Sequence, residues 1–331
     1  MRQRTVLILS VLILTAFTAW QIFATSAKAT RTHLLLAHGL PPDHPVHLGM
    51  VKFKEDVFKR SHGSLDITIY PSAQLGNEKQ ILELVQMGAI SMTKVSSLSL
   101  ESFSPLIGVL NLPFIFRDQQ HYFSVLDSSI GDELLLSTAA KKFHGLTYYD
   151  AGSRSFYANR VINAPADVVG LKIRVMESAT AIRMMQLLGG SPTPMPYGEV
   201  YTALQQGVID GAENNITAIT VNRHGEVIKN YSKVEHISAP EFLLISEPVW
   251  QSLTPENQAI LKEEAEKSKL YQRAVWAERV AEYEKEAQLK LGVKFNTPDR
   301  QPFMRKVLPL HDEYAQRGSD FARLIQAIKS H

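Results

Sequence analysis

An arginine and two neighbouring asparagines are the side chains of this 331-residue chain best suited to hold an anion. Arg174 lies near the end of residues 171–175, where apolar and basic residues alternate with the period of a strand. Asn214 and Asn215 follow a short strand and turn predicted at residues 208–211. Open α/β sheets bind ligands where their strands end, and a guanidinium binds a carboxylate through two parallel hydrogen bonds. The pattern therefore predicts a site for a small organic anion.

A second arginine, Arg154, follows Gly152 where the chain is expected to pass from one domain to the next. Either Arg154 or Arg174 could instead pair with a nearby carboxylate and serve only the fold. Asn214 and Asn215 could likewise belong to a turn and its cap. Position along the chain leaves these alternatives open.

Three histidines in the loop predicted at residues 38–47 raise the question of a metal site. His38, His44 and His47, together with Asp43, match no familiar spacing of metal ligands. We therefore expect a polar loop and no metal. His38 alone is singled out as a site residue, because it directly ends a predicted strand.

Catalysis has little support in the sequence. The carboxylates that could act as a general acid or base show no recognisable pairing: Glu78, Asp210, Glu213 and Glu241. The chain has no Gly-x-Ser-x-Gly nucleophile elbow, no phosphate-binding loop and no dinucleotide-binding fingerprint. It also has no cysteine, which excludes disulfides and thiolate chemistry. We expect a protein that is not an enzyme and needs no cofactor.

Residues 1–29 have the composition of a signal peptide. A basic start is followed by an apolar stretch over residues 6–19, and Ala27-Lys28-Ala29 has the small residues of a cleavage site. We expect cleavage after Ala29 and export to the periplasm. The alternative is an uncleaved membrane anchor, because the apolar stretch continues to Ala24.

The charge balance argues against a nucleic-acid partner. The full chain has 35 Lys and Arg against 33 Asp and Glu, and three of the basic residues lie within residues 1–29. The remaining chain therefore carries slightly more acidic than basic side chains. Its length of about 300 residues suggests two domains of ordinary size.

The predicted elements alternate between strands and helices, which indicates an α/β fold with a mostly parallel sheet. Period-2 segments predict strands at residues 33–37, 65–70, 90–95, 146–150, 153–158, 171–175, 208–211 and 234–246. Helical patterns cover residues 48–60, 78–87, 119–126, 133–143, 199–206 and 255–291. The last of these predicts a helix about 50 Å long, enough to lie along two domains.

Several motifs, in order along residues 31–325, resemble the solute receptors of TRAP (tripartite ATP-independent periplasmic) transporters, the DctP family. The resemblance rests on Phe53-Lys-Glu-Asp-Val, Tyr70-Pro-Ser-Ala-Gln-Leu-Gly, Leu112-Pro-Phe, Gly170-Leu-Lys-Ile-Arg-Val, Pro192-Thr-Pro-Met-Pro-Tyr-Gly-Glu-Val-Tyr-Thr-Ala-Leu-Gln and Gly207-Val-Ile-Asp-Gly-Ala-Glu-Asn. It implies the two-lobe fold of periplasmic binding proteins, with the long helix spanning both lobes. We expect residues 30–151 and 240–280 in lobe I, residues 152–239 and 281–331 in lobe II, and the ligand between them.

The resemblance also implies roles for individual residues. In this family the arginine of the Lys-Ile-Arg-Val motif binds the ligand carboxylate, which would be Arg174 here. The asparagine of the Asp-Gly-x-Glu-Asn motif, Asn214, would assist, and Arg154 stands where many members use a second arginine. The rest of the cleft would be lined by His38, Glu78, Lys94, Ser96, Tyr197 and Glu241.

The segments Asp150-Ala-Gly-Ser-Arg-Ser-Phe-Tyr and Glu213-Asn-Asn are similar to those of members that bind sugar acids, either uronates or aldonates. Lys94 could equally meet a second carboxylate and favour a C4-dicarboxylate. The expected partners are a small organic acid and the membrane permease of a TRAP transporter, and the protein is expected to be a monomer. An exported enzyme acting on the same acids, or a receptor that feeds a sensor, are the alternatives.

Overall fold

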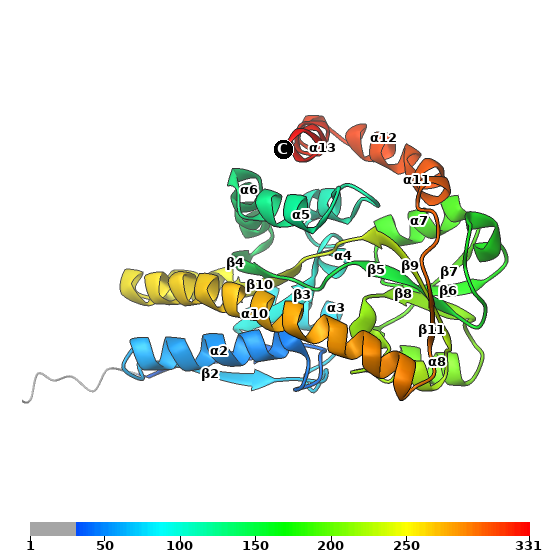
Figure 1. Cartoon of the computed structure of the whole chain (residues 1–331). Coiled ribbons are helices and arrows are strands. Elements are labelled where there is room, and N and C mark those ends of the chain that lie inside the picture. Colours follow the sequence, from blue (N-terminus) through cyan, green and yellow to red (C-terminus); the bar gives the residue numbers. More distant parts are fainter. Residues whose placement is uncertain (1–30) are drawn as a thin grey trace, which may run out of the picture.

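Two β-sheets, each covered by helices, divide the molecule into two lobes (Figure 1). The computed structural model describes residues 31–331, so the signal peptide predicted at residues 1–29 lies outside the described residues. We call the lobe built on the first sheet lobe I and the lobe built on the second sheet lobe II. The α/β class predicted from the sequence is confirmed.

The sheet of lobe I has the strand order β2-β1-β3-β10-β4. Strand β1 is parallel to β2 and β3, whereas β10 is antiparallel to both of its neighbours. Its strands are β1 (Thr32–Ala37), β2 (Leu65–Tyr70), β3 (Met92–Ser96), β4 (Phe143–Tyr149) and β10 (Glu241–Ser246). The longer helices between these strands in the sequence are α2 (Pro45–Arg60), α3 (Glu78–Gln86), α5 (Gln119–Leu126) and α6 (Ser129–Ser137).

Alternation along β1 shows how the sequence builds two buried faces. Leu34 and Leu36 pack in a core with Phe53 of α2, and Ala37 belongs to a second core on the opposite face of the sheet. Successive side chains of a strand point to opposite faces, so an apolar run makes a strand that is buried on both sides.

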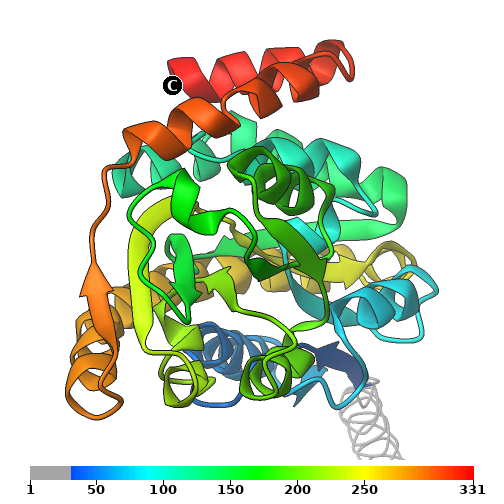
Figure 2. The same cartoon turned by 90° about the vertical axis from the view of Figure 1, so that its right-hand side faces the viewer.

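The sheet of lobe II has the order β11-β9-β5-β8-β6-β7. Its strands are β5 (Arg154–Ala158), β6 (Lys172–Val175), β7 (Ser191–Pro194), β8 (Gly211–Asn214), β9 (Asn230–Ile237) and β11 (Lys294–Asn296). Helices α7 (Ala179–Leu188) and α8 (Val200–Gln205) follow β6 and β7. The chain ends in α11 (Gln301–Val307), α12 (Pro309–Ala315) and α13 (Ser319–Ser330), of which α11 and α12 contact α7 and α13 contacts α6 (Figure 2).

The chain passes between the lobes at two adjacent places. Strand β4 leads into β5 through residues 150–153, and β9 leads into β10 through residues 238–240. The two passages run side by side, because β4 pairs with β10 in one lobe and β5 pairs with β9 in the other. The single return strand predicted at residues 234–246 is therefore two strands, one in each sheet.

A third connection is the long helix α10 (Pro255–Leu289). Thr254 caps its N-terminus by accepting a hydrogen bond from the backbone N–H of Asn257. Near that end α10 buries Leu261 in the core of lobe I, and near its other end it buries Ala287 in the core of lobe II (Figure 1). The prediction of one helix spanning both lobes is confirmed. No helix within residues 31–331 is both long and apolar enough to cross a membrane.

Two boundary predictions were wrong at places that matter for the site. Helix α2 begins at Pro45, inside the predicted loop, because the side chain of His44 caps it. Strand β8 begins at Gly211, where a turn was predicted. A Cβ atom at Gly211 would lie 2.5 Å from the carbonyl oxygen of Tyr157, so glycine is needed there for close approach to β5.

Candidate ligand-binding site

A pocket of about 230 Å³ lies between the two lobes and gathers eight of the nine predicted site residues. Lobe I contributes the ends of β3 and β10 and the N-terminal turn of α3, and lobe II contributes the ends of β5, β6 and β8. The eight residues are Glu78, Lys94, Ser96, Arg154, Arg174, Tyr197, Asn214 and Glu241. The ninth, His38, does not line the pocket.

Arg174 on β6 brings a buried positive charge to the pocket. Its side chain donates from Nε and Nη2 to the carbonyl oxygen of Met195, at 3.1 and 2.8 Å, and its guanidinium carbon lies 5.6 Å from the centre of the Tyr197 ring. The ion pairs found within residues 31–331 do not include Arg174. Burial lowers the pKa of Arg174, but an arginine keeps its charge at neutral pH. The part of the chain that the structure describes thus presents a buried guanidinium that forms no ion pair.

Arg154 on β5 is held very differently. Its Nε and Nη2 atoms donate to the two carboxylate oxygens of Glu213 at 2.6 and 2.8 Å, and its Nη1 atom donates to the amide oxygen of Asn214 at 2.8 Å. Burial alone would raise the pKa of Glu213, but Arg154 and His236 beside it lower that pKa to about 2. Arg154 lines the pocket, yet its charge is balanced by a carboxylate of the same lobe.

This pairing orients Asn214. The amide oxygen of Asn214 accepts from Arg154 and from the backbone N–H of Asn215, at 2.8 and 2.9 Å. The amide nitrogen is therefore the group left to donate into the pocket. Asn214 and Arg174 come from the parallel neighbours β8 and β6, so two donors for an anion stand at the same edge of the sheet.

On the opposite side of the pocket, lobe I offers one ammonium shared by two carboxylates. Lys94 Nζ donates to Glu241 at 2.8 Å and to Glu78 at 3.2 Å. Burial would lower the pKa of Lys94, but the two carboxylates raise it. Burial and the nearby charge of Glu78 raise the pKa of Glu241, against the opposing effect of Lys94. Lys94 is thus already bonded to two carboxylates, so the buried cluster of Glu78, Lys94 and Glu241 has more acidic than basic groups, while Lys79 also lines this side of the pocket.

Two serines of lobe I that line the pocket are also tied into hydrogen bonds. Ser99 Oγ donates to Glu78 at 2.6 Å, and Ser96 Oγ accepts from the backbone N–H of Leu98 at the start of α4 (Ser97–Leu100). These bonds fix the carboxylate of Glu78 and leave lobe I with acceptors along the pocket. Acceptors of this kind suit ligand hydroxyl groups.

The histidine loop at residues 38–47 holds no metal cluster, and its ring nitrogens contact one another, backbone N–H groups and the hydroxyl of Thr217. His38 is fully buried, its Nδ1 accepts from the backbone N–H of Leu40, and its Nε2 lies 3.0 Å from Nδ1 of His47. Between residues 31 and 331 no three His, Cys, Asp or Glu side chains are grouped to hold a metal ion. His38 supports the loop behind the pocket and does not reach the pocket itself.

The pocket also contains residues that the sequence analysis did not select. His44 and Thr217 line it, as do Met176 and residues 39–41. Pro45 directly after His44 was the available signal, because proline is favoured at the first position of a helix and would mark His44 as its cap. The contact of His44 with lobe II could not be predicted from the sequence, because Thr217 lies 173 positions away along the chain.

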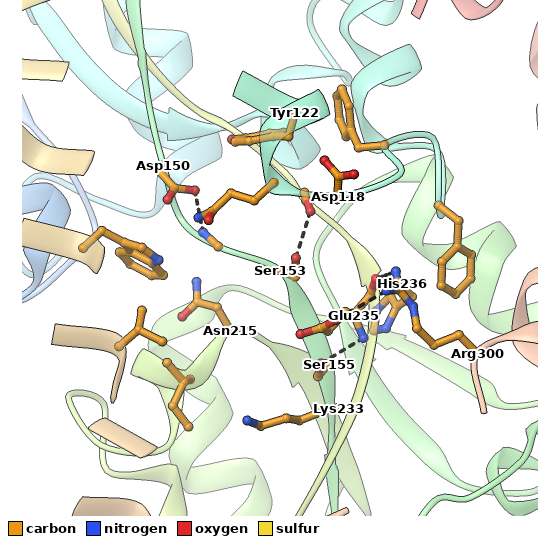
Figure 3. A pocket seen from close by; sticks show the side chains of 18 of the residues that line it. Asp118, Tyr122, Asp150, Ser153, Ser155, Asn215, Lys233, Glu235, His236 and Arg300 are labelled. Carbon is orange, nitrogen blue, oxygen red and sulfur yellow. Dashed lines mark hydrogen bonds and ion pairs between the residues drawn. The ribbon is translucent and has the colours of Figure 1, made fainter. Parts of the chain in front are cut away.

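A larger cavity of about 480 Å³ lies on the other face of β5 (Figure 3). Ser153 and Ser155 line it, whereas Arg154 between them lines the first pocket, as strand alternation requires. Lys233 in this cavity pairs with Glu284, and Arg300 pairs with Glu235. None of the nine predicted site residues lines it. The smaller pocket is therefore the better candidate site.

Comparisons with known proteins identify the family of this chain. Residues 36–317 match the DctP family model, described as bacterial extracellular solute-binding protein, family 7. One similar structure is that of a TRAP periplasmic solute-binding protein of Xanthobacter autotrophicus Py2, solved with bound β-D-galacturonate. Its sequence is 39% identical to this chain and its TM-score is 0.87, and the match covers 90% of this chain and 99% of that one. A TRAP periplasmic solute-binding protein of Anaerococcus prevotii DSM 20548, solved with bound D-glucuronate, is 39% identical with a TM-score of 0.88, over 91% of this chain and 98% of that one.

A characterised relative extends the match over nearly the whole chain. The 2,3-diketo-L-gulonate-binding periplasmic protein YiaO of Escherichia coli is 30% identical over 316 residues, covering 93% of this chain and 95% of that protein. The family is one of binding proteins, which confirms the prediction of a protein that is not an enzyme. The chain belongs to the DctP family of bacterial extracellular solute-binding proteins and is a solute receptor of the TRAP type.

Proposed function

We propose that this receptor binds a hexuronate, such as D-glucuronate or D-galacturonate, and delivers it to a TRAP-type membrane permease. The ligand carboxylate binds Arg174 with help from Asn214 and Arg154, and the ring hydroxyls bind the acceptors of lobe I. The observation that carries the proposal is the buried guanidinium of Arg174, which has no carboxylate partner among residues 31–331. A buried charge is costly unless it is paired, and a ligand carboxylate supplies the pair.

The charge of lobe I supports a monocarboxylate over a dicarboxylate. Glu78 and Glu241 already share the ammonium group of Lys94, so a ligand carboxylate at Lys94 would be a third negative charge around one positive charge. A second ligand carboxylate would meet two like charges, whereas a hydroxyl could donate to them. This argument favours sugar acids that carry one carboxylate over the C4-dicarboxylates left open by the sequence.

The relatives support the same ligand class. The two similar structures named above were solved with galacturonate and glucuronate, and the Escherichia coli relative is a binder of a keto sugar acid. All three are acids with one carboxylate and several oxygens along a six-carbon chain. Delivery to a permease is the role that the family implies for its receptors.

Calorimetric titration with a matched set of ligands tests the proposal. D-Glucuronate and D-galacturonate are expected to bind, while D-glucose, which lacks the carboxylate, and D-glucarate, which carries a second one, are expected to bind at least a hundredfold more weakly. Succinate tests the dicarboxylate alternative directly. Tight binding of succinate or D-glucarate with no response to either uronate would overturn the assignment.

A further inference from the structure

One hydrogen bond in the wall of the ligand pocket joins the two lobes. His44 Nε2, at the start of α2 in lobe I, lies 3.1 Å from Thr217 Oγ1 in the short helix η5 (Ile216–Ala218) of lobe II. Both side chains are about 2% exposed and both line the pocket. The bond therefore exists only while the lobes are in contact at this point.

The direction of this bond is fixed by its neighbours. The backbone N–H of Val46 donates to His44 Nδ1 at 3.1 Å, so Nδ1 is an acceptor and the proton of the neutral ring is on Nε2. His44 Nε2 thus donates to the hydroxyl of Thr217, and that hydroxyl donates to Asn215 Oδ1 at 2.5 Å. A single chain of hydrogen bonds runs from the N-terminus of α2 in lobe I to the cap of η5 in lobe II.

The ring stays neutral over the physiological range. Burial lowers the pKa of His44 to about 3, and the charge of Lys94 acts in the same direction. The ring also packs beside Trp276 of α10, with 6.0 Å between ring centres. The helix that connects the lobes therefore supports the same side chain that bonds across them.

We propose that His44 and Thr217 form a latch that holds the two lobes together over the bound ligand and so sets the rate at which the ligand leaves. The proposal rests on the receptor function proposed above. It assigns His44 a positioning role through Thr217 and does not require contact between His44 and the ligand. One hydrogen bond of this kind is expected to slow dissociation about three- to tenfold.

Four variants separate the latch from the helix cap. His44→Asn keeps a side chain that caps α2 well but is too short to reach Thr217. Thr217→Val removes the hydroxyl at nearly constant shape, and Thr217→Ser restores it. The fourth protein combines His44→Asn with Thr217→Val. Circular dichroism and melting curves confirm that each variant is folded before it is compared.

The first measurement is the dissociation rate of D-glucuronate by stopped-flow fluorescence. We expect dissociation to be about three- to tenfold faster in His44→Asn and in Thr217→Val, with association changed less than twofold. The double variant should be no faster than the faster single variant, because both changes break the same bond. Thr217→Ser should behave like the parent. Additive effects, unchanged rates, or a serine variant that behaves like the valine variant would overturn the latch.

The second measurement does not depend on the ligand. The chain has no cysteine, so Glu83→Cys on α3 and Gln205→Cys on α8 place spin labels at exposed sites, one on each lobe. Pulsed electron spin resonance on the ligand-free protein should show a smaller closed population in the two single variants. If the parent binds no uronate, the proposed ligand is wrong, and the distance distribution alone decides whether the latch exists. An unchanged closed population would then overturn the latch.

Discussion

Arg174 differs from the other buried cations within residues 31–331 in forming no ion pair with a carboxylate. Arg154 has Glu213, and Lys94 has Glu78 and Glu241. Position in the sequence left internal pairing open for both Arg174 and Arg154, and the structure separates them. The side chain whose pairing is incomplete is the one best suited to bind a ligand anion.

Removing the guanidinium of Arg174 should abolish tight binding. We expect Arg174→Ala to weaken hexuronate binding by about 2–5 kcal/mol, because the ligand carboxylate is left buried and poorly paired. Arg174→Lys keeps the charge but not the two parallel donors, and should lose most of the affinity as well. Arg183→Ala is the matched control, since Arg183 lies half exposed on α7 and pairs with Glu313. Calorimetry on the three variants measures their affinity for the hexuronate. Unchanged affinity in Arg174→Ala would refute the role assigned to Arg174.

The two carboxylates around Lys94 should set selectivity against a second ligand carboxylate. Glu241→Gln keeps the shape of the side chain but leaves Lys94 with Glu78 alone. We expect affinity for D-glucarate, relative to D-glucuronate, to rise about tenfold, because one repulsive charge is gone. Glu278→Gln on the exposed face of α10 serves as control. A competition assay that finds the same ratio in the parent and in Glu241→Gln would exclude this charge as the source of selectivity.

At the scale of elements, the edge formed by β5, β8 and β6 positions both arginines and Asn214. Strand alternation predicted which face Arg174 occupies, and the motif containing Asn214 was found from its residues. The prediction failed where contacts are distant in sequence. The residues around Gly211 do not distinguish it from a glycine in a turn, although its lack of a side chain is what lets β8 approach β5. The residues around His38 likewise do not show that it lies outside the pocket.

The bond between Arg154 and Glu213 ties β5 to β8 and should make stability depend on pH. The pKa of Glu213 is lowered to about 2 in the folded protein from its usual 4.5. The ionised carboxylate of Glu213 therefore contributes about 3 kcal/mol to the free energy of unfolding above pH 4.5. This contribution is lost as the pH falls toward 2. Chemical denaturation should find Glu213→Gln less stable than the parent at pH 7, with the difference shrinking below pH 4.5. A difference that stays constant from pH 7 to pH 3 would contradict this role.

The passage from β4 to β5 depends on a glycine packed against α10. Gly152 has φ of +62°, and a Cβ atom there would lie 2.9 Å from the Trp276 ring. Gly207 has a similar φ of +69° but open space around it. Urea denaturation should show that Gly207→Ala lowers the free energy of unfolding by about 1 kcal/mol, through backbone strain alone. Gly152→Ala should lower it clearly more. Equal losses would mean that Trp276 can move aside freely.

At the scale of the whole molecule, the two lobes bring differently balanced buried charges to the pocket. Lobe II brings Arg174, which forms no ion pair within residues 31–331, and lobe I brings two carboxylates that share the single ammonium group of Lys94. The sequence predicted the two-lobe fold, the long helix and most residues of the site, because periodicity and motifs are local. It could not predict charge balance or the bond from His44 to Thr217, since these arise only when distant segments are brought together.

A crystal structure of the protein with D-glucuronate or D-galacturonate tests the central claim most directly. The account predicts a carboxylate in two parallel hydrogen bonds with Arg174, near the amide nitrogen of Asn214, and ring hydroxyls within reach of Glu78 and Glu241. A carboxylate bound to Lys94, or a uronate in the larger cavity on the other face of β5, would contradict it.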